Sequence, residues 1–471
     1  MMDVVVIGGG PAGMTAALRA GDLGAKTVLV TRDEFGGMAA NDGPVPVRTL
    51  AHAARLLRDA RNLDRYGIIA GEPMLDYKRL LGRVREVVQE VRAHSTFSAQ
   101  LKDAGVVVNE QCGVARFTVA HTIETKSGLR LRSDKFVICT GGVSRRLSVP
   151  GAELTVTHSD AWGLTEVPSS MIVIGGGATG AQVASVFNAF GSRIMLFHSG
   201  ARIVPTEDEE VSAAVSAAFR DSGIEVRENF GVVDSFEKTV DGVRMLFSKD
   251  GGREQAEATF AVVAIGWAAN TACLNLDRAS VETDARQFVR VDEFLRTSTP
   301  HVFAAGDVTG RMMLVPQAIQ QGFVAATNAV RGATMRVLEG AAPIGSFTDP
   351  EYAQVGLTET QARAAGDVVV AKVCLDSTTR TIIDGRTSGF CKLIVDRETR
   401  QILGCHVVGE RAVELTQVAA VAMAGRMRVD DLAQVPLSFP TYAGVLGRVA
   451  AKAARRLNLQ LDWQAGELEG Q

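Results

Sequence analysis

The chain has 471 residues, about three times the length of a typical domain, so we expect more than one hydrophobic core. Apolar residues make up 46% of it and charged residues 22%, which excludes a disordered or fibrous protein. The net charge of −3, from 50 Lys and Arg against 53 Asp and Glu, argues against nucleic acid or an anionic membrane as the main partner.

Hydropathy and cysteine spacing point to a soluble, reduced protein. No run reaches the roughly 18 apolar residues of a membrane-spanning helix, and no basic leader precedes the first strand. The six cysteines are scattered without a CxxC pair, so neither a disulfide framework nor a thiolate metal site is predicted. We therefore expect a cytoplasmic protein without stable membrane insertion and without a bound metal.

The first predicted unit is a strand over residues 4–7, a glycine-rich turn, a helix over 14–23 and a second strand over 27–30. The turn reads GGGPAG: Gly8 makes the tight turn, Gly10 lets the backbone approach a pyrophosphate, and Gly13 lets the helix pack on the strand. The helix N-terminus then faces the phosphates with unpaired N–H groups. This context predicts a dinucleotide site.

The same unit recurs with a strand over 171–174, the turn GGGATG over 175–180, a helix and a strand over 193–197. Two fingerprints predict two dinucleotides, and a flavin with a nicotinamide is the chemically sensible pair because one relays hydride to the other. The alternative is that the second unit is a degenerate scaffold, although all three of its glycines are present.

A third signal is the apolar stretch 299–305 that ends in Gly306-Asp307. At this point the chain resembles the pyridine nucleotide–disulfide oxidoreductases, the family of lipoamide dehydrogenase, glutathione reductase and mercuric reductase. The family's crossover segments match residues 139–142 and 264–266, its flavin-ring segment matches 314–318, and the opening of its dimerisation domain matches 347–351 and 355–359. The resemblance implies that Asp307 hydrogen-bonds the ribityl chain of FAD.

The resemblance also implies the fold, an α/β architecture of two Rossmann-like domains and a C-terminal α+β dimerisation domain. The expected FAD domain covers residues 1–148 and 269–343, the NAD(P) domain covers 149–268, and the dimerisation domain covers 344–471. In the last part, residues 389–395 and 402–408 read as strands and 412–424 as a helix, and the clearest boundary is the short break 340–343. A homodimer is expected because the family completes its active site across a two-fold axis.

The family's redox cysteine pair is missing from this chain. The family writes the segment GGTCxNxGCxPSK, and residues 36–48 match its glycines, Asn41 and Pro46, but Ala39 and Pro44 stand at the two cysteine positions. Near the C-terminus, the family's acid–base HPxxxE aligns with Phe439 and Gly444 at the His and Glu positions. Thiol exchange needs a thiolate. We therefore expect that the chain does not reduce disulfides, and mercuric ion reduction is excluded with it.

Other departures concern the flavin itself. The family's lysine near the flavin aligns with Arg48, and its glutamate partner aligns with Gln182. A fixed charge there would stabilise the reduced flavin or orient an acceptor; the alternative is that Arg48 pairs with a carboxylate elsewhere. Ala178, a small residue where the family often has a bulky one, suggests a less gated nicotinamide face. Phe439 suggests an aromatic face for a flat acceptor such as a quinone, whereas Tyr442 reads as ordinary interface core.

The nucleotide-selecting positions depart from both common patterns. Thr31 stands where an acidic residue should bind the FAD ribose, so that contact is weakened or supplied by Asp33 or Glu34. His198 and Ser199 stand at the NAD(P) position, and Arg193, Arg202 and a protonated His198 could accept a 2′-phosphate, which leaves NADH and NADPH both open. By register, the FAD site comprises Gly8, Gly10, Pro11, Ala12, Gly13, Thr31, Arg32, Gly36, Gly37, Thr140, Gly141, Gly306, Asp307, Gln317 and Ala318, and the NAD(P) site comprises Gly175, Gly177, Thr179, Gly180, His198, Ser199 and Gly266.

The functional hypothesis is an FAD-dependent NAD(P)H:acceptor oxidoreductase that passes electrons to a small, quinone-like acceptor without a disulfide. Two alternatives stay open. One is a catalytically silent flavoprotein kept as a redox-sensing or binding module, because fold does not imply function. The other is a pyridine nucleotide transhydrogenase.

Overall fold

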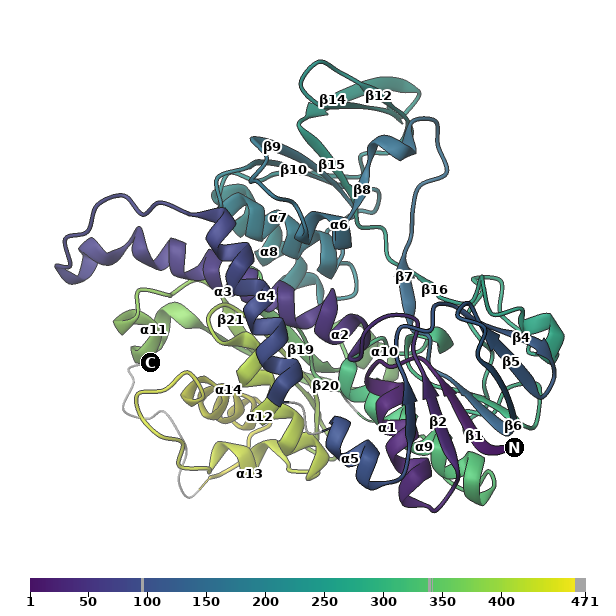
Figure 1. Cartoon of the computed structure of the whole chain (residues 1–471). Helices are drawn as coiled ribbons and strands as arrows, with labels where there is room; N and C mark the ends of the chain where they lie inside the picture. The colour runs from purple at the N-terminus through teal and green to yellow at the C-terminus, as the bar shows by residue number, and fades with distance from the viewer. Residues whose placement is uncertain (95–96, 338–339, 341, 462–471) are drawn as a thin grey trace.

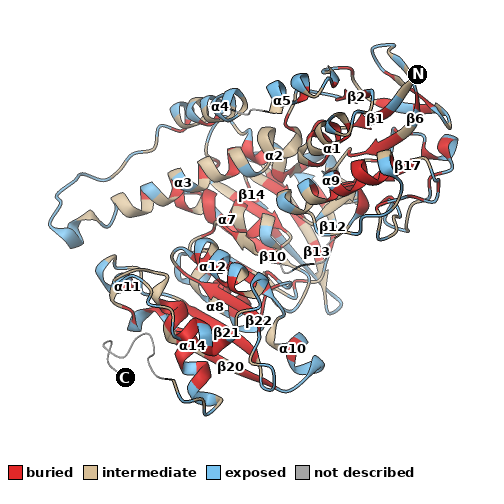
Figure 2. Cartoon of the chain, turned by 90° about the horizontal axis from the view of Figure 1, so that it is seen from below, coloured by how far each residue is buried: buried red, intermediate tan, exposed pale blue. Residues whose placement is uncertain are grey.

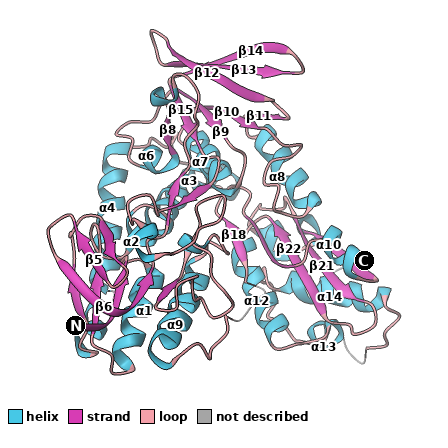
Figure 3. Ribbon diagram, turned by 90° about the vertical axis from the view of Figure 1, so that its right-hand side faces the viewer, coloured by secondary structure: helices cyan, strands magenta, loops and turns pink. Residues whose placement is uncertain are grey.

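The computed structural model describes residues 1–94, 97–337, 340 and 342–461. The residue expected at the middle of the break 340–343, Ala341, and the last ten residues of the expected dimerisation domain lie outside this part. The described chain forms three groups of strands with helices against them, which Figure 3 separates most clearly. No helix in the described residues is long and apolar enough to cross a membrane.

The first sheet carries the N-terminal fingerprint. Its strands follow the order β3-β2-β1-β6-β5-β4, and β17 pairs with β6 on the same sheet. The pairs β3–β2, β2–β1, β1–β6 and β6–β17 are parallel. The pairs β6–β5 and β5–β4 are antiparallel. The strands are β1 (Met2–Ile7), β2 (Thr27–Val30), β3 (Val107–Asn109), β4 (Ala115–Val119), β5 (Thr122–Thr125), β6 (Arg130–Ile138) and β17 (Val302–Ala304). Two helices, α1 (Pro11–Asp22) and α9 (Val315–Arg331), pack together against it.

The second sheet repeats this plan around the second fingerprint, with the parallel order β11-β10-β9-β15-β8. A three-stranded antiparallel sheet covers one face and lies at the top of Figure 1. The parallel strands are β8 (Val156–Thr157), β9 (Ser170–Ile174), β10 (Arg193–His198), β11 (Glu225–Glu228) and β15 (Phe260–Val263), and the cover is β12 (Val232–Lys238), β13 (Val243–Lys249) and β14 (Gly252–Ala258). The helices are α6 (His158–Trp162), α7 (Ala178–Ala189) and α8 (Glu209–Asp221).

A two-stranded ribbon of β7 (Gly142–Ser144) and β16 (Trp267–Ala269) lies where the chain passes between these two sheets (Figure 1). The third sheet is antiparallel throughout, with the order β18-β19-β22-β21-β20. Its strands are β18 (Ile344–Ser346), β19 (Tyr352–Gly356), β20 (Val368–Cys374), β21 (Phe390–Asp396) and β22 (Ile402–Val408), and its helices are α10 (Glu359–Ala365), α11 (Thr379–Ile383), α12 (Ala412–Ala424), α13 (Val429–Ala433) and α14 (Gly444–Arg456). The two strands and the helix expected here are confirmed to within one residue.

The segment that replaces the redox centre leaves the first sheet as α2 (Gly37–Asn41) and α3 (Pro44–Ala60), and it returns through α4 (Tyr77–His94) and α5 (Phe97–Asp103). Along α3, the apolar residues Val47, Leu50, Ala54 and Leu57 recur at helical spacing and are buried. They pack in one core with residues of α7, including Phe187, and with Tyr352 and Phe390 of the third sheet. Figure 2 shows this: α3 is red where it meets the body of the protein, and α4 is largely pale blue. This shared core holds the three parts together around α3.

Candidate functional site

The first glycine turn forms an empty cradle in front of α1. A Cβ added to Gly8 would lie 2.2 Å from the carbonyl oxygen of Cys139, and one added to Gly13 would lie 1.8 Å from that of Gly8. These two positions therefore exclude any side chain. In contrast, the nearest atom to a Cβ on Gly10 is the Cα of Gly37, 3.9 Å away, and no side chain caps the helix, which begins with Pro11. The free N–H groups and the open space fit a pyrophosphate.

The second turn repeats this geometry. A Cβ on Gly175 would lie 2.3 Å from the oxygen of Ala264, and one on Gly180 would lie 1.8 Å from that of Gly175. Gly177 has no atom within 4 Å of such a Cβ, and α7 begins after it without a side-chain cap. The alternative of a degenerate second unit therefore finds no support in the backbone, since the chain keeps the same cradle twice.

Unpartnered polar groups gather between the first cradle and the crossover after β6. The carboxylate of Asp307 accepts no hydrogen bond from any described residue, and burial raises its pKa. Its Cβ lies 3.7 Å from where a Cβ on Gly142 would be. Thr140, two residues before Gly142, has a buried hydroxyl that also lacks a partner in the described chain. Buried polar groups normally find partners. A carboxylate and a hydroxyl left open here fit the hydroxyl-bearing ribityl chain of FAD.

The acidic residues near the FAD ribose position are committed elsewhere. The hydroxyl of Thr31 is buried and donates to the backbone oxygen of Asp33 at 2.5 Å. The carboxylate of Asp33 pairs with Arg32 at 2.6 Å, and Glu34 pairs with Arg92. Both acids are more than half exposed, and each uses one carboxylate oxygen in its ion pair. Gly36 and Gly37 follow with φ of +102° and +57°, and a Cβ on Gly37 would lie 2.6 Å from the Cα of Gly10. These two glycines let the segment pass against the cradle.

The positions of the absent cysteines occupy two consecutive helices. Ala39 lies within α2 and Pro44 is the first residue of α3. Side chains from other elements hydrogen-bond the junction between α2 and α3. Arg92 of α4 donates to Asn41 at 2.9 Å, and the hydroxyl of Ser159 in α6 donates to Asp42 at 2.7 Å. All six cysteines of the chain are free thiols and none lies in this segment. The segment keeps its fold without a disulfide.

Arg48 is bound to Gln182 as the register predicts. Its Nη1 donates to Oε1 of Gln182 at 2.6 Å, and its guanidinium carbon lies 3.4 Å from the ring centroid of Phe347. Burial lowers the pKa of Arg48 to about 10, so it remains charged at neutral pH. No carboxylate lies within ion-pair distance of it among the described residues, so the alternative of an ion pair elsewhere is wrong. The role of Phe347 could not be predicted from the sequence, because this contact joins residues 299 positions apart and leaves no local pattern.

The selecting position of the nucleotide domain is occupied by a neutral ring. His198 ends β10, and its Nδ1 accepts the N–H of Gly176 at 3.2 Å. Burial lowers the pKa of His198, so the neutral form carries its proton on Nε2. Arg202 donates to the backbone oxygens of Glu207 and Pro205. Arg193 begins the strand that His198 ends, so the expectation that it reaches a 2′-phosphate is wrong.

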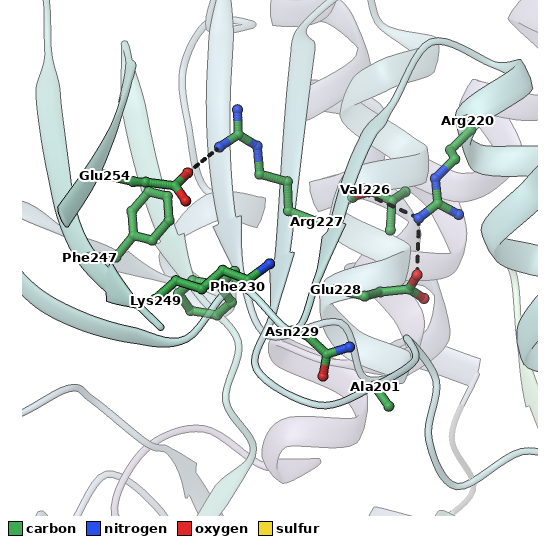
Figure 4. A pocket seen from close by; sticks show the side chains of 10 residues that line it. All are labelled: Ala201, Arg220, Val226, Arg227, Glu228, Asn229, Phe230, Phe247, Lys249 and Glu254. Atoms are coloured by element: carbon green, nitrogen blue, oxygen red, sulfur yellow. Dashed lines mark hydrogen bonds and ion pairs between the residues drawn. The ribbon is translucent and has the colours of Figure 1, made fainter. Parts of the chain in front are cut away.

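An open pocket of about 470 Å³ lies beside this position, at the outer edge of the sheet (Figure 4). It is lined by Ala201, Arg220, Val226, Arg227, Glu228, Asn229, Phe230, Phe247, Lys249 and Glu254. Arg220 pairs with Glu228 at 3.0 Å and Arg227 with Glu254 at 3.5 Å. The N–H of Asn229 donates to the oxygen of Gly200, two residues after His198. The pocket therefore adjoins the ribose end of the second cradle and lies apart from Arg48.

The remaining predicted residues differ in exposure, and Ala318 is buried. Ala178 and Ser199 are exposed, and Thr179 is half-buried in the first turn of α7. Gly141 and Gly266 have no atom within 4 Å of an added Cβ, and Gln317 and Ala318 lie in the first turn of α9, with Ala318 next to Gly306.

The two C-terminal aromatic residues differ in their surroundings. Phe439 is 67% exposed in the single chain. In contrast, Tyr442 is held within the chain, because its hydroxyl donates to the carboxylate of Asp384 at 2.8 Å. No group of three or more potential metal ligands occurs in the described residues.

Comparisons with known proteins agree with this geometry. The model of the family described as pyridine nucleotide-disulphide oxidoreductase matches residues 2–322, and the dimerisation domain of the same family matches residues 342–450. Dihydrolipoyl dehydrogenase of Vibrio cholerae is 31% identical over 95% of this chain and 94% of its own length. That of Thermus scotoductus is 33% identical over 94% and 95%, and mercuric reductase of Lysinibacillus sphaericus is 30% identical over 94% and 80%.

Among solved structures, the HOCl-induced flavoprotein disulfide reductase RclA from Escherichia coli superposes with a TM-score of 0.84 over 95% of this chain and 99% of its own. At 24% identity, this likeness concerns the fold. The two Rossmann-like domains and the C-terminal domain expected from the sequence are confirmed. The chain belongs to the pyridine nucleotide–disulphide oxidoreductase family, whose cofactors are FAD and NAD(P)H.

Proposed function

We propose that the chain is an FAD-dependent NAD(P)H:acceptor oxidoreductase that passes electrons from the flavin to a small, quinone-like acceptor without a disulfide. The observation that carries the proposal is the combination of two open cradles with a redox segment that holds Ala39 and Pro44 in place of thiols. FAD supplies two-electron exchange with the nicotinamide and with acceptors that need no thiol.

The roles of the residues follow from their contacts. The N–H groups after Gly10 and Gly177 bind the two pyrophosphates, and Asp307 and Thr140 bind the ribityl chain. Arg48 keeps a buried positive charge beside the flavin, held by Gln182 and by the ring of Phe347. We expect domain boundaries near residues 148, 268 and 343. We also expect a cytoplasmic homodimer in which Phe439 of one chain reaches the flavin of the other.

The test is an anaerobic titration of the FAD-loaded protein with NADH and with NADPH, followed by flavin absorbance. The proposal expects bleaching by one equivalent of nucleotide and turnover with a quinone. Lipoamide and oxidised glutathione are tested as disulfide substrates. Turnover with either would contradict the proposal that the enzyme works without a thiol. Absence of bleaching despite bound FAD would favour the silent module. Reduction of an oxidised nicotinamide analogue by the other nucleotide would favour the transhydrogenase.

A further inference from the structure

A second acid, the partly buried Glu351, lies four residues after Phe347, and no cation of the described chain lies closer to it than 4.0 Å. Glu351 precedes β19, and only 18% of its side chain is exposed. The nearest cation is Arg55 of α3, whose Nη1 lies 4.0 Å from Oε1 of Glu351. The same Arg55 makes a 2.5 Å contact with Glu410, and Arg411 lies 3.3 Å from that carboxylate. Glu410 therefore receives the short ion-pair contacts of both arginines, and Glu351 keeps only the 4.0 Å contact with Arg55.

The next acid along this segment is already ion-paired. Asp349, two residues earlier, pairs with Arg58 at 3.4 Å and with Arg386 at 3.6 Å. From α12, the backbone N–H of Val413 donates to Glu351. Burial, with the charge of Glu410 second, raises the pKa of Glu351 to about 7. This carboxyl group therefore changes charge in the physiological range.

Arg48 is the link between Glu351 and the flavin site. Both Arg48 and Arg55 lie on α3, seven residues apart, which places them on one helical face. Arg48 hydrogen-bonds a neutral amide and lies against the ring of Phe347, four residues before Glu351. The charge of Glu351 raises the pKa of Arg48, against the larger effect of burial. When Glu351 takes up a proton, the positive charge of Arg48 is less compensated.

We propose that Glu351 is a positioning residue that couples uptake of a proton to reduction of the flavin, acting through Arg48. The inference rests on FAD lying beside Arg48, as in the proposed function, and is independent of the acceptor. Reduction brings two electrons and one proton to the flavin and leaves one added negative charge at the site. That charge favours the protonated form of Glu351, which takes a second proton from solvent. Two protons then accompany two electrons wherever Glu351 is ionised before reduction and protonated after it.

The test is the midpoint potential of the FAD-loaded protein from pH 6 to 9, measured electrochemically with mediator dyes and without nucleotide. Each proton taken up with two electrons contributes about 30 mV per pH unit. The wild type is expected to show a slope of about 30 mV below neutral pH and about 60 mV above it, and Glu351→Gln about 30 mV throughout. A bend that persists in Glu351→Gln, or a wild type without a bend, would overturn the proposal.

Glu410→Gln is the matched variant, because it removes the neighbouring negative charge and leaves Glu351 in place. Its bend is expected at lower pH than in the wild type, and a bend at unchanged pH contradicts the coupling. If Glu351→Gln fails to bind FAD, the wild-type slopes and Glu351→Asp, which keeps a carboxyl group, decide the question. Failure of NADH and NADPH to bleach the flavin would count against the proposed function alone, since this measurement uses neither.

Discussion

The guanidinium of Arg48 donates to the side-chain oxygen of Gln182 at 2.6 Å, and this contact joins α3 to α7. The two helices share a buried apolar core, so the pair is held by packing on both sides. Because the partner of Arg48 is an amide, the positive charge is positioned without being neutralised.

Replacement of Arg48 by Met should lower the midpoint potential of the flavin. A hydrogen bond to a charged group is worth about 1.5–3 kcal/mol, which for two electrons corresponds to about 30–60 mV. Redox titration of the FAD-loaded variant against the wild type measures the shift. Arg83→Met on the exposed face of α4 is the control and should leave the potential unchanged. An equal potential in Arg48→Met would mean that its charge does not reach the flavin.

Reduction of the flavin should not change the number of reactive thiols. All six cysteines are free, two of them exposed, Cys273 and Cys374. The native protein is therefore expected to react with a thiol reagent at two sites, before and after reduction by NADPH, and at all six after unfolding. Two additional thiols after reduction would reveal a disulfide and contradict the proposed mechanism.

A carboxylate at position 198 should favour NADH. The ring of His198 presents Nε2–H as a donor, whereas Glu could accept from the two ribose hydroxyls and would repel a 2′-phosphate. The ratio of kcat/KM for NADH to that for NADPH should rise at least about tenfold in His198→Glu, which corresponds to about 1.4 kcal/mol. Gln255→Glu, which adds a carboxylate at an exposed position of β14 in the same domain, is the control and should leave the ratio unchanged. An unchanged ratio would place the selecting contact elsewhere, with the pocket at Arg227 and Lys249 as the next site to test.

Lys392 should be important for stability. Its side chain is 1% exposed, and its ammonium contacts Asp208 at 2.9 Å, Glu210 at 3.1 Å and Glu359 at 2.5 Å, so it joins the N-terminus of α8 to the third sheet. Lys392→Met leaves these acids without their buried cation and should destabilise the protein by about 3–5 kcal/mol in urea unfolding. The matched variant is Lys372→Met, which removes the exposed pair with Glu210 and should cost about 1 kcal/mol or less. Equal losses in the two variants would contradict the special role of the buried cation.

Glu207 should make the protein less stable above neutral pH. Burial raises the pKa of Glu207 to about 7 from an ordinary value of 4.5. Because the folded pKa is the higher one, stability is full below about pH 4.5 and falls until the pH passes about 7. Glu207→Gln should therefore gain up to about 3 kcal/mol at pH 8 and little at pH 4.5. Urea unfolding at both pH values checks this, and equal gains at both would assign the effect to packing instead of charge.

The sequence by itself determined the two glycine turns, the strands that precede them and the absence of the thiols. Each of these is a local property: Gly8 and Gly175 need backbone freedom that their own residue type supplies, and Ala39 and Pro44 carry no sulfur in any fold. The register of the family resemblance also aligned Arg48 with Gln182, 134 residues apart.

Only the tertiary structure decided what surrounds those residues. Phe347 lies over Arg48, the charge of Glu351 acts on Arg48, and Thr31 turns its hydroxyl to the backbone of Asp33. None of these interactions follows from a periodicity of the sequence. They arise because α3 is packed against α7 and the third sheet in one core, which brings together side chains from three parts of the chain. Burial in that core, and the competition of Glu351 and Glu410 for Arg55, set the charges at the site, since both depend on distances that no single segment contains.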